Sequence, residues 1–282
     1  MNPSVAQQLR ALCPDALADD APVLVWVRAP SPAPLLAGLV GGGQPWVSWS
    51  PAGDDTAWRV EGAGSAWAVR AASLAAVHAE CLPRLRTTRV VRGPGVREAP
   101  EPRAFFAARF DPADRRNDPA WEGFPIAWAL APQVLLARRP NGTLLLGWQG
   151  TAGQLRALDA LPHAPEATNL PQPSPGLQPE ARTRWDALVA AALADFETGA
   201  LEKVVAARRE PLEGPWGVGR GAVPAAVLGA LDGALAGRSG VAFGLCPGGG
   251  AGVFVGATPE CLVRRRGDGV EADALAGSMP RG

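Results

Sequence analysis

Short runs of apolar and β-branched residues, separated by glycine, proline and asparagine, make up the first 150 residues of the chain. Residues 23–27 are a clear run of this kind and predict a buried strand. The same pattern predicts strands at residues 46–49, 56–60, 66–69, 104–110, 126–130, 134–137 and 143–148. Asn141-Gly142 predicts a hairpin between the last two, and Gly62-Ala63-Gly64 predicts another between 56–60 and 66–69.

Apolar residues at helical spacing predict a second kind of element. The predicted helices of the first 200 residues span residues 4–12, 71–82, 152–161 and 185–196. Pro83 is expected to end the second of them, because proline lacks the backbone N–H that an interior helical position needs. The last shows apolar residues at intervals of three and four between Trp185 and Phe196, and Gly199 follows as a stop.

A proline-rich segment at residues 165–179 is the best internal boundary of the chain, because it shows little periodicity. It separates a predicted N-terminal half, residues 1–165, from a predicted C-terminal domain, residues 180–282. In that domain we expect strands at 201–208, 241–245 and 253–255 and a helix at 225–235. Gly256 to Val263 is interpreted as a turn that leads into a strand. Gly267-Asp268-Gly269 is interpreted as a turn after which residues 270–275 pair with that preceding strand.

Short turns between consecutive strands favour antiparallel pairing. The predicted class is therefore α+β, with antiparallel sheets and flanking helices. The hydrophobic content of 47% against 19% charged residues supports a folded chain with a sizeable core.

Charge and cysteine usage narrow the functional classes. The formal net charge is zero, so neither nucleic acid nor an anionic membrane is an expected partner. No apolar run reaches about 18 residues and the first 20 residues lack a signal-peptide core, which predicts a cytoplasmic protein. Cys13, Cys81, Cys246 and Cys261 are scattered, so we expect buried thiols and neither a zinc site nor a disulfide framework.

Lys203 is the only lysine among 27 lysine and arginine residues. In a strand at 201–208 its side chain shares a face with Leu201, Val205 and Ala207, which favours a desolvated amine. A buried lysine shifts its pKa readily and can act as a base, whereas arginine cannot. A composition this rich in arginine also leaves one lysine by chance, and a lysine near a strand end can reach solvent, so the residues alone leave both interpretations open.

Three stretches, in this order and at these separations, resemble the chorismate-utilising enzymes, and most of all the isochorismate synthases. They are Leu201-Glu202-Lys203-Val204-Val205-Ala206-Ala207-Arg208, Gly256-Ala257-Thr258-Pro259-Glu260-Cys261-Leu262-Val263 and Asp273-Ala274-Leu275-Ala276-Gly277-Ser278. Upstream, Ala108-Arg109-Phe110-Asp111-Pro112 and Trp121-Glu122-Gly123-Phe124 resemble the more variable first half of that family. The resemblance is strong from about Ala181 and moderate from about Phe105.

The resemblance implies a magnesium-dependent exchange on the ring of chorismate, as in menaquinone or siderophore biosynthesis. Lys203 matches the lysine that activates water, and Glu260 matches the glutamate that protonates the leaving hydroxyl. Gly277 and Ser278 match the segment that receives a substrate carboxylate. Taken without the resemblance, Glu260 is a turn residue of the kind that is usually solvated, and Gly277 is compatible with a strand bulge.

Family members continue past the segment that ends in Gly277 and Ser278. The continuation carries the glutamates that bind magnesium, an arginine for a substrate carboxylate and further strands of the sandwich. We therefore expect the metal ligands to lie beyond Gly282, the chorismate-binding domain to be incomplete and the chain alone to be inactive. Alternatives are a salicylate synthase, an aminating chorismate enzyme, although Lys203 disfavours anthranilate synthase, and a non-catalytic fragment that binds a complementing C-terminal chain.

Overall fold

The computed structural model describes residues 4–29, 44–52, 57–111, 113, 121–159, 161, 179–207, 233, 240–260 and 262–272. The chain divides into two compact units. The first comprises Met1–Thr168 together with Gly219–Gly282, and the second comprises Asn169–Val218. The predicted helix at 225–235, apart from Gly233, and residues 165–178 of the predicted boundary lie outside the described residues.

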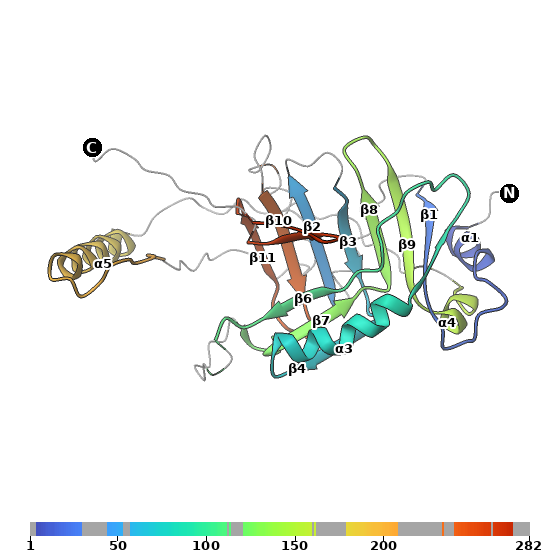
Figure 1. The fold of residues 1–282 in the computed structure, drawn as a ribbon, viewed down its shortest axis with the longest axis horizontal. Coiled ribbons are helices and arrows are strands. Elements are labelled where there is room, and N and C mark those ends of the chain that lie inside the picture. Colours follow the sequence, from blue (N-terminus) through green and yellow to red (C-terminus); the bar gives the residue numbers. More distant parts are fainter. Residues whose placement is uncertain are drawn as a thin grey trace. The chain divides into compact units, whose positions relative to one another are not determined.

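An eight-stranded sheet forms the centre of the described part of the first unit (Figure 1). Its strands run in the order β11-β10-β2-β3-β8-β9-β1-β5, and every neighbouring pair is antiparallel except β1 and β5. They are β11 (Phe254–Thr258), β10 (Gly240–Cys246), β2 (Trp46–Ala52), β3 (Arg59–Ala63), β8 (Val134–Arg138), β9 (Leu144–Thr151), β1 (Pro22–Arg28) and β5 (Arg89–Arg92). The α+β class with antiparallel sheets is confirmed.

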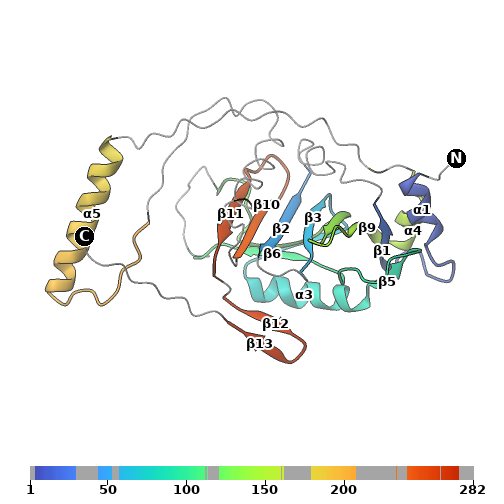
Figure 2. The ribbon, with the colours of Figure 1, turned by 90° about the horizontal axis from the view of Figure 1, so that it is seen from above.

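Both faces of the sheet are buried around β1, which explains its continuous apolar run. Val23, Val25 and Val27 lie in one core cluster, while Leu24 and Trp26 lie in another, as the two-residue period of a strand requires. The first cluster is covered by α1 (Val5–Ala11) and α4 (Ala152–Arg156), which lie together beside β1 and β9 (Figure 2). Both short helices begin with a capping box, at Ser4 and Thr151, which satisfies their first backbone N–H groups.

A three-stranded sheet, in the order β4-β7-β6, packs against the large sheet. Its strands are β4 (Trp67–Ala71), β7 (Ala127–Ala131) and β6 (Phe105–Ala108). Trp128 and Leu130 of β7 meet Val47 of β2 in a shared core. On its other face, Val69 and Ala129 pack with residues of α3 (Leu74–Thr87). The first unit thus stacks helices, a large sheet, a small sheet and a further helix (Figure 1).

The hairpin predicted at Asn141-Gly142 is confirmed. β8 and β9 pair antiparallel, and Gly142 has a φ of 82°, a backbone conformation that favours glycine. The hairpin predicted between residues 56–60 and 66–69 is wrong, because β3 pairs with β2 and β8 while β4 pairs with β7. Gly64, with a φ of 68°, directs the chain out of the large sheet, and the Ala66 N–H donates to the Ala131 carbonyl of the small one.

Pro83 does not end α3, contrary to the prediction. The helix begins after Ser73, whose hydroxyl accepts from the Ala76 N–H, and continues past Pro83 to Thr87. Pro83 itself is exposed, so its ring causes no conflict with the core. Val77 and Cys81 hold the helix against the small sheet, and the Thr88 hydroxyl donates to the Arg84 carbonyl at its end. Tertiary packing here overrides the local stop signal.

In the second unit, α5 (Pro179–Glu197) confirms the predicted helix and its stop. Gly199 has a φ of 73° and its N–H donates to the Phe196 carbonyl, and the Ala200 N–H donates to the Asp195 carbonyl. The strand predicted at 201–208 is wrong over residues 201–207, which form no regular structure. A β-branched segment needs a neighbouring strand for its backbone, and the described residues of this unit include none.

The hairpin predicted around Gly267-Asp268-Gly269 is confirmed by the pairing of β12 (Arg264–Arg266) with β13 (Gly269–Glu271). Cys13, Cys81 and Cys246 are free thiols, as expected, and the last two are buried. None of the helices that the structure describes is long and apolar enough to cross a membrane.

Burial raises the pKa of the thiols of Cys246 and Cys81, and the charge of Glu80 raises that of Cys81 further. A raised pKa leaves less thiolate at pH 8, and the thiolate is the nucleophile. We expect iodoacetamide to alkylate both cysteines at least about tenfold more slowly in the folded chain than in urea. Site-resolved mass spectrometry of timed aliquots measures this. Equal rates in the two states at either cysteine would contradict the burial described.

Candidate functional site

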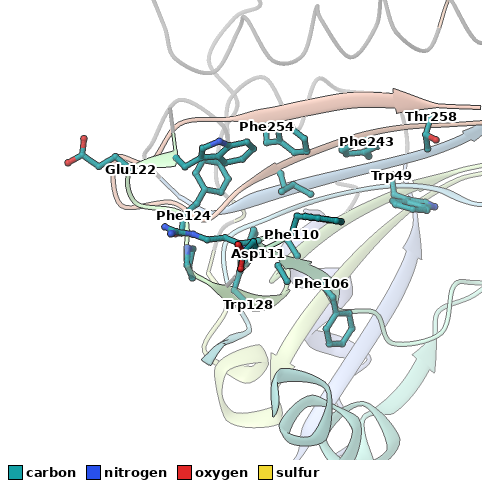
Figure 3. Close-up of a pocket in the computed structure, with 16 residues that line it drawn as sticks. Trp49, Phe106, Phe110, Asp111, Glu122, Phe124, Trp128, Phe243, Phe254 and Thr258 are labelled. Atoms are coloured by element: carbon teal, nitrogen blue, oxygen red, sulfur yellow. The ribbon is translucent and has the colours of Figure 1, made fainter. Parts of the chain in front are cut away.

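Three of the segments singled out in the sequence meet around a cavity of about 1380 Å³ in the first unit (Figure 3). Residues 108–111, residues 121–124 except Gly123, and Thr258 all line it. Aromatic rings of eight described residues make up most of the wall. They are Trp49, Phe106, Phe110, Trp121, Phe124, Trp128, Phe243 and Phe254.

The end of β6 is held to the segment that precedes β7. The Arg109 N–H donates to the Ile126 carbonyl at 2.8 Å, and the Arg109 Nη2 donates to the Phe124 carbonyl at 3.2 Å. These bonds position residues 105–109 and 124–126 as one side of the cavity. One guanidinium N–H of Arg109 therefore serves the protein itself.

The Trp121-Glu122-Gly123-Phe124 segment packs against the turn between β10 and β11. A Cβ atom added to Gly123 would lie 2.8 Å from the Cβ of Ala251, and Gly123 has a φ of 79°. The Trp121 and Phe254 ring centroids are 5.2 Å apart, and those of Phe243 and Phe254 are 5.7 Å apart. A glycine at position 123 thus permits the close approach that joins the two sides of the cavity.

We expect Gly123→Ala to lower the free energy of unfolding by about 2–4 kcal/mol, because alanine adds both left-handed backbone strain and overpacking against Ala251. Gly142→Ala is the matched control. Gly142 has a φ of 82° but no atom within 4 Å of an added Cβ, so it carries the strain alone, about 1–2 kcal/mol. Urea unfolding of both variants measures the difference. An equal loss in the two would contradict the packing described.

The cavity carries little charge for its size. Arg109, Asp111 and Glu122 are the charged residues of its described lining. The Asp111 Oδ1 accepts from the Ala113 N–H at 2.8 Å, and the Glu122 side chain points away from the labelled rings (Figure 3). The rings offer contact area to an apolar or aromatic group, and Arg109 is the one cation of the described lining.

Glu260 lies at the end of β11, two residues after Thr258 of the cavity wall. The Thr258 hydroxyl accepts from the Glu260 N–H at 3.2 Å and donates to the Glu260 carbonyl at 3.3 Å, so the backbone of this turn is fixed. The Glu260 side chain is exposed. A carboxyl at this position can exchange protons with a molecule that approaches from solvent.

Lys203, Gly277 and Ser278 are not among the described residues that line this cavity. Lys203 belongs to the second unit, where its side chain is exposed. Gly277 and Ser278 lie outside the described residues. The roles predicted for all four residues remain predictions.

Comparison with known proteins then decides the family. The sequence profile described as "Chorismate binding enzyme" matches residues 49–282, which is most of the chain. The chain belongs to the chorismate-binding enzyme family. Its structure is similar to that of MenF, the menaquinone-specific isochorismate synthase from Escherichia coli, with a TM-score of 0.50 and 16% identity. The similarity covers 94% of this chain and 57% of the MenF chain, and no curated protein matches in sequence.

This chorismate-binding enzyme does not show a magnesium site within the described residues. No three histidine, cysteine, aspartate or glutamate side chains gather there in a way that could hold a metal ion. Magnesium prefers one or two carboxylates together with water and substrate oxygens.

The aromatic wall is the part of the cavity that the sequence did not predict. Trp26, Trp46 and Trp148 are core residues, each at most 1% exposed. Trp49 and Trp121, at 41% and 43% exposed, line the cavity of the chorismate-binding enzyme instead. Trp46 and Val47 of the same strand are buried, so the pattern alone could not distinguish Trp49 from them.

Proposed function

We propose that this chain carries the base and the acid of an isochorismate synthase, which converts chorismate to isochorismate. Lys203 is the observation that carries the proposal. It is the only lysine of the chain, and it stands where the isochorismate synthases that the sequence resembles have their water-activating lysine. Membership of the chorismate-binding family supports chorismate as the substrate.

In the proposed reaction, Lys203 as a neutral amine accepts a proton from water while the water oxygen bonds to a ring carbon. The ring double bonds shift, and the bond between the ring and the 4-hydroxyl breaks on the opposite face. Glu260 as a neutral acid gives its proton to that oxygen, so one water is added and one is released. General acid and base groups of this kind typically contribute about 10²–10⁴-fold each to rate.

The proposal concerns the chain together with a polypeptide that supplies the rest of the enzyme. The chain spans 57% of the length of the similar synthase, and the described residues provide no magnesium site. We propose that turnover of chorismate requires magnesium ligands that a complementing C-terminal chain supplies. The free thiols of Cys13, Cys81 and Cys246 suit a reducing compartment such as the cytoplasm.

The test is an assay of purified protein with chorismate, with and without magnesium, in which products are separated by liquid chromatography. The chain is assayed alone and after co-expression with the polypeptide encoded downstream of codon 282. Magnesium-dependent isochorismate from the co-expressed preparation is the expected result. Salicylate as the end product, or a product that requires ammonia, would assign one of the sister activities. No turnover in either preparation would leave a binding role and overturn the catalytic proposal.

A further inference from the structure

A second, smaller pocket of about 230 Å³ lies at one end of the large sheet and shares no lining residue with the aromatic cavity. It forms where the end of β1, the turn between β8 and β9, and the segment between β5 and β6, called the connector below, come together. Its described lining residues are Arg28, Trp58, Gly95, Val96, Arg97, Glu98, Arg139, Asn141, Thr143 and Leu145.

A series of hydrogen bonds holds the connector against the sheet. The Gly93 N–H donates to the Trp26 carbonyl at 2.8 Å, and the Trp26 Nε1 donates to the Pro100 carbonyl at 3.1 Å. The Arg28 Nε donates to the Gly95 carbonyl at 3.2 Å. These bonds fix the backbone that presents Arg97 and Glu98, so this wall of the pocket is preorganised.

The opposite wall is equally well held. In the turn between β8 and β9, the Arg139 N–H donates to the Thr143 carbonyl at 3.0 Å, and the Thr143 N–H donates to the Asn141 Oδ1 at 3.0 Å. The Arg139 guanidinium stacks on the ring of Trp58, 4.3 Å from its centroid, and pairs with Glu98. With its Oδ1 used in the turn, Asn141 keeps its amide N–H groups as donors.

The pocket has a surplus of positive charge. Three arginines, Arg28, Arg97 and Arg139, face one carboxylate, that of Glu98, which leaves an excess of two positive charges among the described lining residues. Glu98 is engaged by Arg139, and Arg97 is exposed and forms no ion pair in the described part of the chain. Guanidinium groups that stack on a ring while their edges donate are typical of sites for carboxylate and phosphate.

We propose that this pocket binds a small dianion, either a phosphate or a compact dicarboxylate. Two anionic groups balance the charge surplus, the volume suits a molecule of a few heavy atoms, and Arg97 and Asn141 supply uncommitted donors at the rim. If the arginines served only to hold the connector against the sheet, Arg28 and Arg139 would be explained, but Arg97 would have no role. This anion site does not depend on chorismate turnover. Its test can therefore fail without affecting the proposed isochorismate synthase activity.

Isothermal titration calorimetry of the full chain at low ionic strength, with inorganic phosphate in one arm and succinate in the other, tests the proposal. We expect saturable binding with a Kd of about 1 mM or below in at least one arm. Binding should weaken as sodium chloride is added, because salt screens exposed charges. The tighter arm identifies the ligand class. Absence of saturable binding in both arms would overturn the proposal.

Arg97→Ala tests whether the anion binds in this pocket, because Arg97 lines it. Arg97 is exposed, so its removal should leave the described fold contacts intact. We expect Kd to rise about fivefold or more in this variant, the upper range for a partly exposed charge pair. Arg70→Ala is the matched control, since Arg70 is an exposed arginine on β4 outside the pocket. Unchanged affinity in Arg97→Ala, or an equal loss in Arg70→Ala, would show non-specific charge attraction and reject the site.

Discussion

Trp26→Ala is expected to lower the free energy of unfolding of the first unit by about 3–5 kcal/mol, with a Tm lower by roughly 10 °C. The Trp26 side chain is fully buried in the core between the large sheet and the connector. Its ring fills the space above Gly147, where an added Cβ would lie 2.6 Å from the ring. Alanine leaves a cavity there and removes the donor that the buried Pro100 carbonyl accepts from.

Two further variants separate the causes of this loss. Trp49→Ala removes the same side chain from the rim of the aromatic cavity, where it is 41% exposed, so a smaller loss of about 1–3 kcal/mol is expected. Trp26→Phe keeps most of the ring but loses the Nε1 donor, for which about 1–3 kcal/mol is expected. Urea unfolding followed by fluorescence and circular dichroism measures all three. A loss in Trp26→Ala no greater than in Trp49→Ala would contradict the position given to this core.

Local signals predicted seven of the eight strands of the large sheet, and β5 was not predicted. The alternation of Val23, Val25 and Val27 with Leu24 and Trp26 is a property of one strand, and it places both sets without reference to the rest of the chain. The Asn141-Gly142 turn likewise carries its own backbone preference. For these features the sequence alone was sufficient.

Pairing between strands could not be predicted from the same signals. β3 and β4 are adjacent in sequence and separated by glycines, yet they join different sheets because each finds a better partner far along the chain. The same reasoning applies to Pro83, whose stop signal is outweighed by the anchoring of Val77 and Cys81. Tertiary contacts with distant residues outweigh a local conformational preference of a few kcal/mol, and these contacts cannot be read from the local sequence.

The candidate site residues were assigned in a different way, by resemblance and not by geometry, and their roles remain predictions. Residues 108–111, three residues of the 121–124 segment and Thr258 line one cavity, although nothing in their spacing implied contact between Gly123 and Ala251. The strand expected around Lys203 did not form over residues 201–207, because a strand is stable only beside another. The chemical role of Lys203 is therefore tested by measuring the activity of variants.

Lys203→Arg provides the sharpest test of that role. If the amine is the base, arginine should lower kcat by about 10²–10⁴-fold, because a guanidinium keeps the positive charge but cannot give up its proton to become a base. If the lysine only attracts a substrate carboxylate, arginine should retain most of the activity and change mainly KM. Glu202→Gln is the matched control, since Glu202 is the exposed neighbour of Lys203 and has no assigned role.

Glu260→Gln should likewise lower kcat by about 10²–10⁴-fold, because an amide cannot give a proton to the departing hydroxyl. The size and shape of the side chain are preserved, and Thr258 contacts only the backbone of residue 260, so folding should be unchanged. Steady-state assays of isochorismate formation, on the preparation that turns over chorismate, measure both variants. Base and acid act in one exchange, so the double variant should fall well short of the product of the two single losses. Two single losses that multiply fully would mean that Lys203 and Glu260 serve separate steps, and near-normal kcat in either single variant would remove that residue from the proposed mechanism.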